Sequence, residues 1–154
     1  SDSLFRRALN GGEGKYGFLD IIDNYESTPA AKLATYSAGM AYLNLGEYVN
    51  AIEYLDQFDT DDILLKALAK GAIGDAFAQI DQPEEAYDYY VAAFESSDNS
   101  FSAPKYLFKA GILGNSLGKN SAALAYFKRI QSEYPDSSEA RKVEVQIGLL
   151  ENIN

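Results

Sequence analysis

The sequence contains no cysteine and no histidine. Without cysteine there is neither a disulfide framework nor a thiolate nucleophile, and without histidine a common general base and metal ligand is also missing. Catalysis would then depend on carboxylates, lysine, tyrosine or serine, and these residues show no pattern typical of a catalytic site. We therefore predict that the protein is not an enzyme, with no catalytic residues and no bound metal.

No nucleotide-binding motif stands in the context that it needs. Gly12, Gly14 and Gly17 match the spacing of a dinucleotide fingerprint, but no strand precedes them. The stretch from Gly114 to Lys119 resembles a phosphate-binding loop but has one residue too few between its glycines, and Asn120 stands where serine or threonine is required. We predict that the protein binds no cofactor.

Basic residues and long apolar runs are scarce as well. Lysine and arginine number 13 against 23 acidic residues, which gives a net charge of −10 that repels phosphate. We therefore predict no nucleic-acid partner. No apolar run approaches the roughly 18 residues of a membrane span. Because the sequence begins at Ser1 rather than methionine, we expect membrane association only through an N-terminal anchor that is absent from it.

Hydrophobic residues are abundant, and they recur at long intervals. They make up 47% of the 154 residues, enough for the core of one domain. Small and large residues alternate in three copies, the second 35 residues after the first and the third 37 residues after the second. The copies are Gly39, Tyr42, Gly46, Ala51 and Leu55; Gly74, Phe77, Ala86 and Tyr90; and Gly111, Gly118, Ala123, Phe127 and Pro135.

This spacing predicts pairs of antiparallel helices. A glycine and an alanine allow two helices to approach closely, and the larger residues fill the space around them. We therefore expect Gly39, Gly74 and Gly111 to be buried at helix contacts. Gly46 is expected to end the first helix in the left-handed conformation.

The pattern resembles that of tetratricopeptide repeats, whose period is about 34 residues. The resemblance implies an all-α fold: a right-handed α-α superhelix of three full repeats with an N-terminal half repeat and a C-terminal capping helix. We expect a single domain over residues 1–154, divided into a half repeat at 16–29, repeats at 32–65, 67–100 and 104–137, and a capping helix at 138–152.

The N-terminal edge poses a separate question. The helix expected from Tyr16 to Tyr25 resembles the second helix of a repeat whose first helix would precede Ser1. Apolar side chains meant for that helix would then be exposed, which favours a weak homodimer through this edge. Alternatively, Leu4 and Phe5 fold back over them.

Stacked helix pairs form a groove lined by the first helix of each repeat. Positions two, five, nine, twelve and thirteen of each repeat should face it, which predicts a surface suited to an apolar peptide or a partner helix. Tyr36 and Met40 stand where a carboxylate clamp has lysine and asparagine, so we expect no such clamp. The predicted groove residues are Leu33, Tyr36, Met40, Leu43, Asn44, Leu68, Asp75, Gln79, Lys105, Phe108, Ile112 and Asn115.

Several stretches are similar to the YfgM family, whose founding member is an ancillary subunit of the SecYEG translocon, and to its Bacteroidetes relatives. They are residues 8–11, 17–22, 42–46, 73–77 and 109–111. The resemblance implies a periplasmic domain of a membrane-anchored, non-catalytic interaction protein, whose partners are translocon, chaperone or client proteins. The alternative is a structural scaffold or assembly subunit of an unrelated envelope or cytoplasmic complex.

Overall fold

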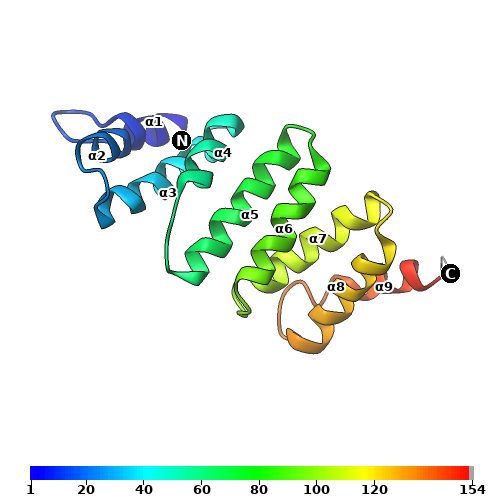
Figure 1. Ribbon diagram of the computed structural model, residues 1–154. Helices are drawn as coiled ribbons and strands as arrows, with labels where there is room; N and C mark the ends of the chain where they lie inside the picture. The colour runs from blue at the N-terminus through cyan, green and yellow to red at the C-terminus, as the bar shows by residue number, and fades with distance from the viewer. Residues whose placement is uncertain (153–154) are drawn as a thin grey trace.

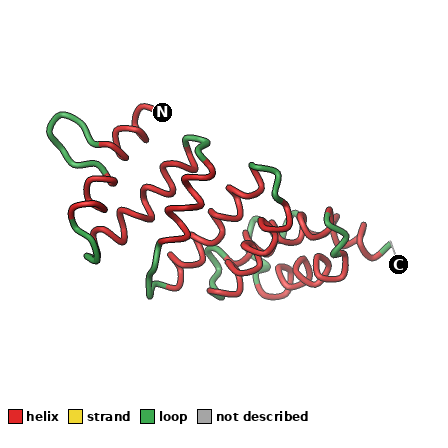
Figure 2. Tube along the Cα trace, turned by 45° about the horizontal axis from the view of Figure 1, so that its top comes forward, coloured by secondary structure: helices red, strands yellow, loops and turns green. Residues whose placement is uncertain are grey.

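The computed structural model describes residues 1–152, which form nine α-helices and no strand. Successive helices pair and stack along one direction, so that the first and the last helix lie at opposite ends of the molecule (Figure 1 and Figure 2). This arrangement confirms the predicted α-α superhelix. The helices are α1 Asp2–Asn10, α2 Phe18–Asn24, α3 Pro29–Asn44, α4 Tyr48–Gln57, α5 Ile63–Gln79, α6 Pro83–Ser96, α7 Ala103–Ser116, α8 Asn120–Glu133 and α9 Val143–Glu151.

Local sequence determines where several helices begin and end. The Thr28 hydroxyl accepts the N–H of Ala31 at the start of α3, and the Asp62 carboxylate accepts two backbone N–H groups at the start of α5. Gly46 and Gly118 follow α3 and α7 with φ of 75° and 78°, a conformation that favours glycine. The predicted role of Gly46 is confirmed.

The three register-matched glycines lie where the two helices of a pair touch. A Cβ atom added to Gly39 would lie 2.6 Å from the Leu55 side chain, and one added to Gly74 would lie 2.8 Å from the Tyr90 ring. Gly111 faces Phe127 in the same way. All three glycines are buried. Each is covered by the residue 16 positions later, as the repeat pattern predicts.

The first helix of each pair also contacts the neighbouring pair, and the core of the stack has three parts. Its largest part lies between α6, α7, α8 and α9, around the fully buried side chains of Leu107, Phe127 and Ile130. A second part joins α4 to α5 around Leu55 and Ile73. Within residues 1–152 no helix is both long and apolar enough to cross a membrane.

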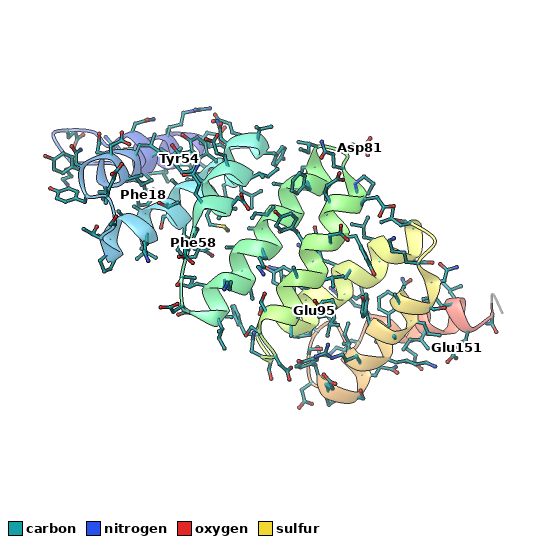
Figure 3. The ribbon with its side chains drawn as sticks, in the orientation of Figure 1. Phe18, Tyr54, Phe58, Asp81, Glu95 and Glu151 are labelled. Carbon is teal, nitrogen blue, oxygen red and sulfur yellow. The ribbon has the colours of Figure 1, made fainter. Side chains whose placement is uncertain are left out.

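The N-terminal edge is covered by α1, which corrects our expectation that its apolar side chains would be uncovered. Leu9 is buried together with Ala38 of α3, and Phe5 packs against the same cluster as Phe18. Figure 3 shows Phe18 and Tyr54 at this end of the stack. The α1 helix takes the place that we assigned to a helix preceding Ser1. Of the two residues expected to fold back, Phe5 does so, whereas Leu4 is exposed.

The last helix begins later than expected. We expected a capping helix at 138–152, but α9 starts at Val143. The Ser137 hydroxyl instead donates to the carbonyl of Tyr134 and accepts the N–H of Ala140, which closes a local turn. Turns therefore occupy residues 138–142.

Candidate functional site

Two adjoining cavities lie over the first helices α3, α5 and α7. They share Ala78, Tyr90 and Lys109, and together we call them the groove. One is almost wholly apolar, has a volume of about 280 Å³ and is lined by Ala78, Tyr90, Phe108, Lys109, Ile112, Leu113 and Ser116. The other is more polar, has a volume of about 450 Å³ and is lined by Leu43, Tyr48, Asp75, Ala78, Gln79, Tyr90 and Lys109.

A hydrogen-bonded cluster around Asp75 separates the two cavities. The Tyr90 hydroxyl donates to Asp75 Oδ1 at 2.7 Å, and the Lys109 ammonium lies 2.5 Å from the same oxygen. The ammonium also lies 5.5 Å from the centre of the Tyr90 ring. Asp75 and Lys109 are half-buried, so their mutual attraction is less screened than that of a surface pair. The cluster joins α5, α6 and α7.

Tyr90 reaches this cluster because of Gly74. Its ring lies across the glycine, where any Cβ atom would be in the way, and its hydroxyl thereby meets Asp75, the residue after that glycine. The equivalent residues Leu55 and Phe127 carry no hydroxyl. Burial, and then the Asp75 charge, raise the pKa of Tyr90, so it stays protonated as a hydrogen-bond donor.

Tyr106 is a second buried tyrosine beside Asp75. Burial raises its pKa most, followed by the charge of Asp75. The ring lies so close to Gly71 that no Cβ atom fits there, and it stacks at 6.3 Å from the ring of Tyr90. Tyr106 therefore packs against the tyrosine that donates a hydrogen bond to Asp75.

Ile112 is the most exposed of the large apolar residues that line the apolar cavity. It lies on α7 and is 39% exposed. Phe108 also lines this cavity, but its ring lies 6.0 Å from that of Phe127 and it belongs to the core as well. Such a surface can bury an apolar side chain of a ligand without moving the helices.

The structure brings five of the twelve predicted residues to the groove. Leu43, Asp75 and Gln79 line the polar cavity, and Phe108 and Ile112 line the apolar one.

Of the other predicted residues, Tyr36, Met40 and Leu68 are partly buried against the core and line neither cavity. The Tyr36 ring packs at 5.1 Å from that of Phe58, so these side chains hold the repeats together.

The remaining four also line neither cavity. Leu33 and Lys105 are exposed, Asn115 is half-buried, and the exposed Asn44 side chain donates a hydrogen bond to the Met40 carbonyl of its own helix. Lys105 lies on α7 one turn before Lys109.

Sequence reasoning missed six residues of the groove: Tyr48, Ala78, Tyr90, Lys109, Leu113 and Ser116. Tyr48 and Tyr90 belong to second helices, which the position rule leaves out. One signal for Tyr90 was present in the sequence, since it is the only hydroxyl-bearing residue among the three that cover a repeat glycine.

The groove offers apolar burial and hydrogen bonding to a ligand. The one carboxylate in it is already engaged by Lys109 and Tyr90. In the part of the chain that the structure describes, no three metal-ligating side chains gather in one place. The arrangement therefore suits the binding of a chain segment.

Two models of the tetratricopeptide repeat family match the sequence, one over residues 34–59 and the other over residues 106–137. The chain contains tetratricopeptide repeats. The matches cover α4 and α8 together with most of α3 and α7, and the pair α5–α6 between them repeats the same glycine contact. A search of curated proteins finds no match. Tetratricopeptide repeats in general bind proteins or peptides, and this protein is accordingly an interaction module.

Proposed function

We propose that this repeat protein is the periplasmic domain of a membrane-anchored protein, and that its groove binds partners of the secretion translocon, envelope chaperones or their clients without catalysis. The observation that carries the binding role is the pair of cavities that meet at Tyr90 and Lys109. The similarity of several stretches to the YfgM family supports the envelope setting. The family match supports an interaction role.

The alternative is a scaffold subunit of another envelope or cytoplasmic complex. The half-buried Asp75–Lys109 pair at the centre of the groove favours a specific partner. A ligand that covers these two charges without offering them polar contacts is disfavoured. A scaffold would hold one dedicated partner, whereas a translocon-associated module would meet several. The two functions therefore differ in the number of proteins that contact the groove.

A photo-crosslinking amino acid at Ile112 distinguishes them. Ile112 lies in the apolar cavity, and Val49, which is 69% exposed on the second helix α4, is the control because it lines neither cavity. In living cells that express the full-length protein, we expect several adducts from position 112 that contain translocon or chaperone components, and none from position 49. A single adduct of one partner would favour the scaffold. Equal crosslinking from both positions would contradict a binding role for the groove.

The absence of cysteine allows a separate test of the location. Val49→Cys introduces the only thiol into the sequence, at an exposed position. A maleimide that does not cross the cytoplasmic membrane should label this variant in spheroplasts as fully as in lysed cells. Labelling only after lysis would place the domain in the cytoplasm.

A further inference from the structure

The last helix, α9, continues the row of groove residues beyond α7. Phe108 and Ile112 of α7 are followed 37 residues later by Val145 and Leu149, the interval that also separates Gly74 from Gly111. Val145 and Leu149 are 69% and 60% exposed, so this side of α9 is apolar and open. We infer from the register that α9 adds a fourth helix to the row formed by α3, α5 and α7.

A contact between α7 and α9 supports this register. The Lys142 ammonium, at the start of α9, lies 5.7 Å from the centre of the Phe108 ring. Phe108 itself lines the apolar cavity. The beginning of α9 therefore adjoins the groove.

Two lysines occupy equivalent positions of the sequence register, Lys105 in the first turn of α7 and Lys142 directly before α9. Lys105 and Lys142 are 37 residues apart, and both are exposed. The Lys105 ammonium lies 5.4 Å from the centre of the ring of Tyr106, the next residue of α7, whereas the Lys142 ammonium, at the start of α9, lies over the ring of Phe108 of α7. Neither takes part in any ion pair within residues 1–152. Both ammonium groups are therefore positioned and available to an anion.

Most acidic residues of this acidic protein lie outside the first helices α3, α5 and α7. In α3, α5 and α7 the only acidic residue is Asp75, which Lys109 and Tyr90 engage. The second helices α4 and α6 carry acidic residues and no basic one. These acidic residues are Glu53, Asp56, Glu84, Glu85, Asp88 and Glu95.

The two acidic residues of α9 do not alter this distribution. Glu151 pairs with Lys128 of α8 at 2.8 Å. In the repeat register, Glu144 of α9 corresponds to the buried Leu107 of α7. It therefore lies on another side of the helix from Lys142. The side of α7 and α9 that borders the groove is thus apolar with a positive rim, in a chain of net charge −10.

We propose that the groove binds an acidic peptide with one large apolar side chain. The proposal rests on the peptide-binding role proposed above and names the ligand class. The apolar side chain enters the cavity beside Ile112, side-chain carboxylates pair with Lys105 and Lys142, and the peptide continues over Val145 and Leu149 of α9. Charge complementarity selects this ligand. A basic peptide would be repelled by the two lysines and would find no unpaired acidic residue on the first helices.

The probes are three fluorescent peptides with an acetylated N-terminus and an amidated C-terminus. The acidic probe has a central leucine flanked by glutamates, the basic probe has lysines in place of the glutamates, and the polar probe has serine in place of the leucine. Fluorescence anisotropy with the complete chain at low salt measures their affinities. We expect the acidic probe to bind most tightly, and each of the other two about tenfold more weakly.

Charge reversal in the protein identifies the site. Lys105→Glu and Lys142→Glu should each weaken the acidic probe about fivefold and strengthen the basic one, the size expected of an exposed charge pair. The matched control is Lys66→Glu, which removes another exposed lysine of a first helix. Lys66 borders a different cavity, with Leu55 and Tyr89, so its variant should change both probes little. All three side chains are exposed, so circular dichroism should show an unchanged fold.

Several outcomes would overturn the proposal. The first is equal affinity for the acidic and basic probes. The second is an acidic probe that does not bind, or whose affinity is unchanged by both charge reversals. The third is binding that appears only when the C-terminus of the peptide carries a free carboxylate. The proposed function is decided independently. If the acidic and basic probes bind equally and Ile112→Asp abolishes the binding of both, the groove binds peptides without selecting acidic ones, and the crosslinks from position 112 decide whether it has partners in cells.

Discussion

The Tyr90 hydroxyl donates a 2.7 Å hydrogen bond to the Asp75 carboxylate of the facing helix, across a glycine. The repeat register determines where the ring lies, since Tyr90 covers Gly74 just as Leu55 covers Gly39. The hydroxyl adds something that the other two pairs lack, a link from the second helix to the polar centre of the groove. One side chain thus contributes to the packing of the repeat and to its binding surface.

Tyr90→Phe should separate these two contributions. The ring stays over Gly74, and only the hydrogen bond to Asp75 is lost, so the free energy of unfolding should fall by about 1 kcal/mol. Urea denaturation measures the change. Tyr48→Phe is the control, because its hydroxyl lies 3.5 Å from Gln79 at an exposed site, and it should change stability little. A loss of equal size in both variants would mean that the Tyr90 hydrogen bond contributes no more to stability than the exposed hydrogen bond of Tyr48.

Alanine at two glycines should have opposite effects. Gly74→Ala places a Cβ atom 2.8 Å from the Tyr90 ring and should lower the free energy of unfolding by about 1 to 3 kcal/mol; Gly74→Leu should cost more. Gly148 of α9 has nothing within 4 Å of the same position, so Gly148→Ala should stabilise the protein by up to about 1 kcal/mol. Thermal denaturation of both variants checks this, and an unchanged midpoint for Gly74→Leu would contradict the register.

The N-terminal helix should keep the protein from associating through its N-terminal edge. Removal of residues 1–10 uncovers Phe18 and Leu19, which pack with Leu9 and Phe5 in the complete chain. We expect the shortened chain to show an average mass that rises with concentration in sedimentation equilibrium, whereas the complete chain shows no association through this edge.

Single substitutions in α1 provide a matched pair for the same question. Phe5→Asp places a charge in the cluster and should loosen α1, so hydrogen exchange in α1 and α2 should accelerate. Leu4→Asp changes a neighbouring residue that is 67% exposed and should have little effect. Equal effects of the two substitutions would show that α1 does not cover the edge through Phe5.

Alkaline pH should destabilise the fold through tyrosine ionisation. Burial and a hydrogen bond to Asp98 raise the pKa of Tyr134 from 10.0 to about 12, so the folded protein keeps a proton that the unfolded chain loses above pH 10. This contribution is therefore complete below pH 10 and is lost as the pH rises towards 12, at about 1.4 kcal/mol per pH unit. Urea titrations between pH 9 and 11 should show a shallower decline for Tyr134→Phe than for the unaltered protein. Parallel declines would contradict this assignment.

The sequence alone determined the helix pairs and their register. A glycine followed 16 residues later by a large side chain is a local pattern. Close approach of two helices admits few residue types other than glycine at the first of these positions. The starts of α3 and α5 were also readable, since Thr28 and Asp62 satisfy backbone N–H groups of their own helices. Contacts of this kind depend on residues close together in the chain, so they follow from spacing.

The tertiary structure alone decided what fills the N-terminal edge and what forms the centre of the groove. The sequence left open whether Phe5 would fold back over this edge, and it did not indicate that Leu9 would reach the cluster around Ala38, because that contact depends on how a glycine-rich loop closes. Lys109 meets Asp75 from 34 residues away, and Tyr36 turned out to pack on Phe58 rather than to line either cavity. Sequence spacing gives the side of a helix on which a residue lies, whereas the angle between stacked helices decides which of these residues is buried and which meets a ligand.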